Sequence, residues 1–277
     1  MKRLIACVVF IVLVCSGSEI QAQPPYELQV HGHDNCIYLD NSPGVRMRLA
    51  DGASYVITAS GNAYYESGSP FKNLLYRHSH SSGADITRIL GIGSDDTLHQ
   101  GWADPRYSFY VMLIDWSDLS DNTGTVTLDT NGYPGPSVDA KSNCITLTSS
   151  PATITTVPPG EYTVEFSGNA YYVGPNGQFR EVVIHYKGVS GDITDIVSKG
   201  FTKQISLRSG SPNVAGFFVD WCTLDDNGGT GVITLTPVSG GNIPTLSEWG
   251  LIIFGVVLLG FISWVFLRRR KVIGVRI

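Results

Sequence analysis

Two acidic loops hold the oxygen-rich side chains with which this chain could bind a metal ion. In each loop an Asp ends a hydrophobic run, and an Asp-Asn pair follows six residues later. The two sets are Asp115, Asp121 and Asn122, and Asp220, Asp226 and Asn227. If each loop folds back on itself, these oxygens converge, and calcium prefers about six to eight oxygen ligands. The same residue types also suit plain turn hydrogen bonds, so spacing alone leaves both interpretations open.

The two loops occupy the same place in an internal repeat. Residues 60–65 read Ser-Gly-Asn-Ala-Tyr-Tyr and return unchanged at 167–172. The tripeptide Asn-Cys-Ile likewise stands at both 35–37 and 143–145. A period of roughly 105 residues indicates a duplicated domain, because solenoid repeats are much shorter.

The pattern of apolar residues predicts an all-β fold. Residues 161–166 alternate between polar and apolar types, which is typical of a half-buried strand. Residues 107–116 and 214–221 are almost continuously apolar and indicate central strands, and neither copy shows a helical period. We therefore predict two tandem antiparallel β-sandwiches of jelly-roll type. Their bounds are 23–130 and 139–237, joined by a flexible Pro/Gly linker at 131–138 and followed by a second linker at 238–242.

Charge and motif content exclude several function classes. The chain has a formal net charge of −5, but residues 23–242 alone hold 12 basic and 22 acidic side chains. A net charge of −10 does not suit a phosphate backbone, so we expect no nucleic-acid partner. The sequence contains no Gly-x-Ser-x-Gly, phosphate-binding loop or His-Glu-x-x-His motif. We expect a protein that is not an enzyme.

Cysteines and aromatic residues near the loops each allow two interpretations. Cys36 and Cys144 are repeat equivalents, and Cys222 has no counterpart in the first copy. Either all three are buried thiols, or Cys144 and Cys222 form a disulfide bridge. Trp116 and Trp221 follow the loop aspartates directly and are either core residues or part of a sugar-binding rim.

Two histidines can be aligned between the copies. We expect His78 and His185 to share a strand position and to be hydrogen-bonded structural residues.

Both ends of the chain carry targeting signals. Residues 1–22 combine a basic start, an apolar run and a small-residue cleavage site, which predicts a secretory signal peptide. Residues 249–267 contain no charge and are long enough for a transmembrane helix. Four basic residues follow at 268–271, so the positive-inside rule places this end in the cytoplasm and the two modules on the periplasmic side.

The C-terminal tail resembles a known sorting signal. Residues 243–250 read Ile-Pro-Thr-Leu-Ser-Glu-Trp-Gly, directly before the apolar span and the basic cluster. Motif, span and cluster together resemble the IPTL-CTERM signal of Gram-negative bacteria. The motif positions are Ile243, Pro244, Thr245, Leu246, Trp249 and Gly250. The resemblance implies an exosortase-type transpeptidase as partner and a final location at the cell surface or outside the cell.

Each module is similar to the calcium-dependent galactose-binding bacterial lectins of the PA-I type. The similarity rests on the turn at 159–161, the Gly-Asn-Ala-Tyr-Tyr segment at 168–172 and the acidic loop. It implies that the carbonyls of Tyr65 and Tyr172 join the loop side chains around calcium. We therefore expect an exported protein that binds calcium and carbohydrate without catalysis. The alternative is a structural, matrix or adhesion protein that binds no glycan.

Overall fold

The computed structural model describes most of the repeat region and a short part of the tail. The described residues are 24–79, 85–101, 109–116, 118–148, 151–174, 177–221, 225–238 and 254–264. The predicted signal peptide, most of the second linker, the sorting motif and the basic cluster lie outside them. The chain divides into two units, residues 1–238 and residues 239–277.

The described residues are mostly β-strand, as the sequence predicts. In the first half, one sheet has the order β11-β10-β4-β5 with β8 on β4, and another has the order β12-β9-β6-β7 with β3 on β9. The strands of this half are β3 (Val45–Met47), β4 (Ser54–Glu66), β5 (Ser69–Pro70), β6 (Asn73–Ser79), β7 (Asp85–Gly91), β8 (Asp95–His99), β9 (Phe109–Asp115), β10 (Thr123–Thr130), β11 (Tyr133–Asp139) and β12 (Cys144–Thr146). We call this part half I.

The remaining strands form half II, whose main sheet has nine strands. Its path is β1-β21-β14-β19-β17-β20-β13, with β18 on β17 and β2 on β20, and β15 and β16 pair separately. The strands are β1 (Tyr26–His31), β2 (Cys36–Tyr38), β13 (Thr153–Thr155), β14 (Gly160–Gly168), β15 (Tyr171–Val173), β16 (Gly177–Gln178), β17 (Glu181–Gly188), β18 (Gly191–Ser198), β19 (Thr202–Leu207), β20 (Val214–Asp220) and β21 (Thr230–Pro237). A 3-10 turn, η1 (Leu39–Asn41), follows β2.

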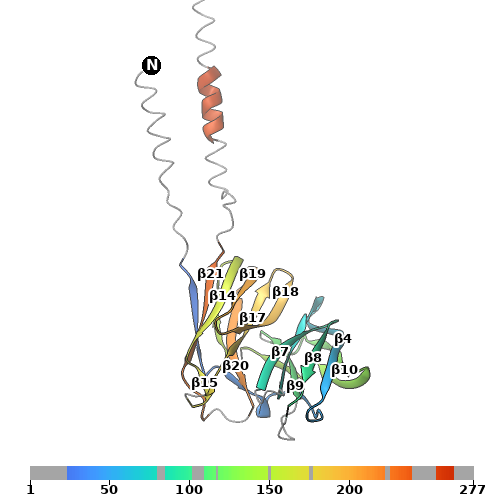
Figure 1. Cartoon of the computed structure of the whole chain (residues 1–277). Helices are drawn as coiled ribbons and strands as arrows, with labels where there is room; N and C mark the ends of the chain where they lie inside the picture. The colour runs from blue at the N-terminus through green and yellow to red at the C-terminus, as the bar shows by residue number, and fades with distance from the viewer. Residues whose placement is uncertain are drawn as a thin grey trace, which may run out of the picture. The chain divides into compact units, whose positions relative to one another are not determined.

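The two halves exchange their first strands. Strand β1 precedes the first copy but pairs with β21 of the second, in the register Tyr26 to Leu235 (Figure 1). Strand β11 precedes the second copy but pairs with β10 of the first. Strands β2 and β12 repeat the exchange through parallel pairs with β20 and β9. Each half is therefore completed by a segment that stands before the other copy in the sequence.

This exchange corrects two predictions. Residues 131–138 are not a flexible linker, because β11 (Tyr133–Asp139) is an edge strand of half I. Its Val138 is fully buried in the core of half I, while Leu28 and Val30 of β1 are buried in the core of half II. The predicted module bounds 23–130 and 139–237 therefore cut across the structural halves.

The halves also share a hydrophobic interface, so they are not independent beads. A third buried cluster joins residues of both copies, including Met112, Ile114 and Trp116 from half I and Phe217, Val219 and Trp221 from half II. Strands β9 and β20 are buried along their whole length. One face of each strand packs into its own half and the other into the interface, which explains why the two runs are almost continuously apolar.

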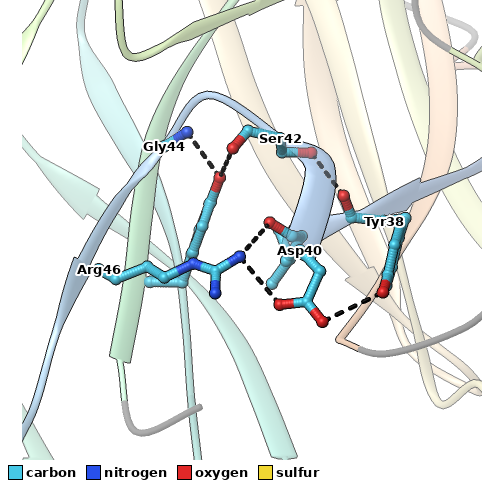
Figure 2. A network of polar contacts seen from close by, with 7 residues as sticks. Tyr38, Asp40, Ser42, Gly44 and Arg46 are labelled. Carbon is cyan, nitrogen blue, oxygen red and sulfur yellow. Dashed lines mark hydrogen bonds and ion pairs between the residues drawn. The ribbon is translucent and has the colours of Figure 1, made fainter. Parts of the chain in front are cut away.

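The crossover from β2 to β3 carries the chain from half II to half I and is held by a polar network (Figure 2). The hydroxyl of Tyr110 on β9 donates to the carbonyl of Ser42 at 2.7 Å and accepts from the amide of Gly44 at 2.6 Å. Arg46 forms an ion pair with Asp40 at 2.9 Å, and its guanidinium lies 5.8 Å from the Tyr110 ring centroid. Burial raises the pKa of Tyr110 to about 12, so it remains a donor at neutral pH.

The register of β6 and β17 corrects the alignment of the histidines. His185 pairs with Ala215 of β20, whereas the residue of β6 in the corresponding place, opposite Tyr110 of β9, is Arg77. His185 therefore faces the interface and is the structural equivalent of Arg77, not of His78. The alignment of His78 with His185 is out of register by one residue, and a shift of one residue moves every side chain of a strand to the other face of the sheet.

The tail is described only at residues 254–264, which are helical. They form part of the predicted span 249–267. Within the described part of the chain, no helix combines the length and the apolar character needed to cross a membrane.

Candidate functional site

The loop aspartates end the two central strands, and strand alternation decides where they point. Leu113 of β9 belongs to the core of half I, while Ile114 and Trp116, which directly follows the strand, belong to the interface. Asp115 shares the face of Leu113 and is only 5% exposed. One oxygen of Asp115, Oδ1, accepts a hydrogen bond from the Trp116 amide at 2.6 Å. The carboxylate is thereby fixed inside half I.

In half I, two buried side-chain oxygens of the loop residues have no hydrogen-bond donor among the described residues. Asn122 is fully buried, and its Nδ2 donates to the Ala140 carbonyl at 2.9 Å. That bond fixes the amide orientation and leaves Asn122 Oδ1 without a donor among the described residues. The buried Oδ2 of Asp115 also has no donor among them. An unsatisfied buried oxygen costs about 1–3 kcal/mol. A cation bound between such oxygens would remove that cost.

The electrostatics of the half I site follow from burial. Desolvation and, to a smaller extent, the nearby charge of Asp121 raise the pKa of Asp115 from 3.8 to about 6, although the hydrogen bond from the Trp116 amide lowers it. Asp121 itself is exposed. The site therefore combines one buried carboxyl, one buried amide oxygen and one solvent-facing carboxylate. All three predicted side chains of the first loop come together.

The half II site gathers the equivalent residues and one predicted carbonyl. Asp220 Oδ1 accepts from the Trp221 amide at 2.7 Å, as Asp115 does from Trp116. One terminal atom of the Asn227 amide lies 3.1 Å from Asp220 Oδ2 and 2.9 Å from the Tyr172 carbonyl oxygen. The surrounding acceptors favour nitrogen at this position, and the nitrogen then donates to both oxygens.

In half I the orientation of the Asn122 amide is fixed instead by the bond from its nitrogen to the Ala140 carbonyl. Desolvation also raises the pKa of Asp220, and the exposed Asp226 adds to that shift. Tyr64 is the β-pairing partner of Thr123 in half I, and Tyr171 forms the equivalent β-bridge to Gly228 in half II. This register brings Tyr65 beside Asn122 in the way that Tyr172 lies beside Asn227.

The donor set fits calcium better than a softer metal. Its atoms are carboxylate, amide and carbonyl oxygens, which are the ligands of hard cations. Among the residues that the structure describes, no group of three or more His, Cys, Asp or Glu side chains could hold a metal ion. A metal site here would therefore depend on amide and backbone oxygens.

The structure corrects the predicted sugar-binding role of the tryptophans. Trp116 and Trp221 are 6% and 4% exposed and lie in the interface between the halves. Trp116 packs edge-on to His185 at 5.0 Å, and Trp221 lies under the Arg77 guanidinium at 5.8 Å. Each therefore contacts the equivalent residue of the opposite half. Neither ring is available to stack on a sugar.

The exchange places a thiol beside each site. Cys36 and Cys144 are buried and free, so Cys144 forms no bridge with Cys222, which itself lies outside the described residues. Burial raises the pKa of both thiols, and the nearby Asp220 and Asp115, respectively, raise it further. Sequence reasoning missed these neighbours and Ala140, because they reach the sites only through the exchanged segments.

Comparisons with known proteins identify the tail but not the repeats. The IPTL-CTERM motif matches residues 243–270. No curated protein matches the chain. One solved structure was found as a match to this chain, the N-terminal CBM22-1–CBM22-2 tandem domain from Paenibacillus barcinonensis Xyn10C. The match has 11% sequence identity and covers 72% of this chain and 76% of that one. Its TM-score is 0.10, so it carries no argument about the fold. The tail bears the IPTL-CTERM motif, which marks an exported protein sorted to the cell surface.

Proposed function

We propose that this exported protein binds one calcium ion in each half and uses half II to bind carbohydrate without catalysis. The observation that carries the calcium proposal is the pair of buried oxygens, Asp115 Oδ2 and Asn122 Oδ1, that have no donor among the described residues. Asp121 and the carbonyl of Tyr65 complete the set in half I. In half II the corresponding ligands are Asp220, Asp226, Asn227 and the carbonyl of Tyr172.

Carbohydrate binding belongs to half II because that site borders an open surface. Tyr172, whose carbonyl faces Asn227, also lines two adjoining hollows of about 780 and 550 Å³. Sugar-binding sites of this size combine polar groups with an apolar ring. Phe201 lines the larger hollow and is 71% exposed, so it supplies the ring that the buried tryptophans cannot.

A structural role at the cell surface is the second candidate. The burial of Trp116 and Trp221 in a shared interface favours it, because calcium beside these residues would stiffen the joint between the halves. In both cases the tail is the substrate of an exosortase-type enzyme. Before processing, the chain is held by a single membrane span at 249–267, with both halves on the periplasmic side.

The test is a calorimetric titration of calcium into the purified full-length chain in detergent. We expect about two ions per chain and none in the Asp121→Ala/Asp226→Ala variant. The control is Asp95→Ala/Glu165→Ala, which removes two exposed carboxylates from other strands and should still bind two ions. Equal loss in both variants, or no binding to the wild type at millimolar calcium, would refute the proposal.

A further inference from the structure

A groove of positive charge lies between β6 and β7 of half I and the Tyr172 region of half II. The two hollows share Tyr172, Gln178, Phe179, Arg180 and Glu181, so they form one continuous surface. Arg77 and Arg88 line one end and Lys199 lines the other. Four cations thus face two carboxylates, Asp85 and Glu181, in a repeat region with a net charge of −10. Such a local reversal of sign favours an anionic ligand.

Arg77 forms the floor of the groove, and one nitrogen of its guanidinium group has no hydrogen-bond acceptor among the described residues. It is 7% exposed, its Nη1 donates to Thr87 at 2.8 Å and its Nη2 lies 3.6 Å from Asp85. Its buried Nε has no hydrogen-bond partner among the described residues. A buried guanidinium nitrogen without an acceptor is unusual, and an anionic oxygen in the hollow would satisfy it.

The arginines on the rim are suited to carboxylates. Arg180 is exposed and has no ion pair with any described residue. Arg88 lies 3.4 Å from Asp96, a long contact for an ion pair, and is 42% exposed. Planar guanidinium groups bind carboxylates through paired hydrogen bonds. Lys199 is held at the other end by the Gly168 carbonyl at 2.6 Å and Gln178 at 3.0 Å.

We propose that this groove binds an acidic oligosaccharide, with sugar carboxylates on Arg88 and Arg180 and a pyranose face on Phe201. The inference rests on the proposed carbohydrate function and names its substrate class. The two hollows together have room for more than one sugar unit. A ligand that follows the groove passes Tyr172, so it reaches the edge of the proposed calcium site in half II.

The experiment titrates a short oligogalacturonate of defined length into the full-length chain, beside a neutral galacto-oligosaccharide of equal length. We expect the acidic probe to bind and the neutral one to bind at least about tenfold more weakly. Arg88→Gln/Arg180→Gln should weaken the acidic probe about tenfold or more, which corresponds to about 1.4 kcal/mol. Arg48→Gln removes an exposed charge on another part of the chain and should leave binding unchanged.

Calcium stoichiometry is measured on the same samples, so that the two proposals can fail separately. If two ions bind but both oligosaccharides bind alike or not at all, the acidic-ligand inference is wrong and the calcium proposal stands. If the acidic probe binds through the arginines while no calcium binds, the groove stands and the calcium proposal is wrong. A loss with Arg48→Gln equal to that of the double variant would overturn the inference, because binding would then follow net charge alone.

Discussion

Replacing Asp115 by Asn should make the calcium-free protein more stable and remove its response to calcium in half I. Burial raises the pKa of Asp115 from 3.8 to about 6, so without a cation the charged form is disfavoured in the folded state. A shift of this size corresponds to about 3 kcal/mol at neutral pH. Asn has nearly the same shape and carries no charge, so it avoids that cost while it loses the ligand.

The sign of the pH dependence follows from proton binding. Between pH 3.8 and about 6 the folded state binds more protons at Asp115 than the unfolded state does. The contribution of Asp115 to the free energy of unfolding should therefore fall as pH rises through this window, whereas buried His185, with its pKa lowered to about 3, contributes a rise. Burial raises the pKa of Asp220 too, so the second site adds to the fall. Calcium should oppose that fall, because it stabilises the ionised carboxylates.

The assay is urea unfolding of the full-length chain at pH 4 and pH 7, with chelator or with millimolar calcium. At pH 7 in chelator, Asp115→Asn should be more stable than wild type by up to about 3 kcal/mol. With calcium the difference should shrink or reverse. Asp95→Asn is the matched control, since Asp95 is exposed and its variant should follow wild type throughout. A wild type that exceeds the variant at pH 7 in chelator, or a stability difference between the two that does not grow from pH 4 to pH 7, would refute this reasoning.

Three further perturbations test the exchange and the interface. Tyr110→Phe removes both hydrogen bonds to the crossover and should cost about 1–3 kcal/mol in urea unfolding, whereas no loss would show that the network is incidental. Trp221→Ala should cost about 3–5 kcal/mol, and a loss below 1 kcal/mol would contradict its place in the interface. Deletion of residues 24–32 removes β1, so hydrogen exchange should rise first in β21 and β14 of half II; a first rise in β10 would contradict the strand exchange.

The sequence predicts local features well because they depend on neighbours in the chain. The apolar runs at β9 and β20 are buried on both faces, as continuous hydrophobicity indicates. The acidic residues of each loop converge because one short loop joins the strand that the Asp ends to the strand that follows the Asp-Asn pair. The Tyr172 carbonyl lies at the half II site because the neighbouring Tyr171 pairs with Gly228, next to Asn227.

The sequence does not reveal which copy each strand completes. Strands β1 and β11 precede equivalent segments, and either copy could accept either strand, so no local pattern shows the exchange. Pro134, Gly135 and Pro136 indicate a linker, yet edge strands tolerate proline because one side of their backbone faces solvent. Trp116 and Trp221 are buried because each packs against residues of the other copy in the interface, and the sequence does not show that contact.

The most direct test of the account is a crystal structure of the protein grown with calcium, with anomalous data that locate the metal. We expect two anomalous peaks per chain. One lies within coordination distance, about 2.3–2.6 Å, of oxygens from Asp115 and Asn122, and the other within that distance of Asp220, Asn227 and the Tyr172 carbonyl. Density without a metal at either site, with the Asn227 amide nitrogen turned towards Asp220, would contradict the calcium proposal.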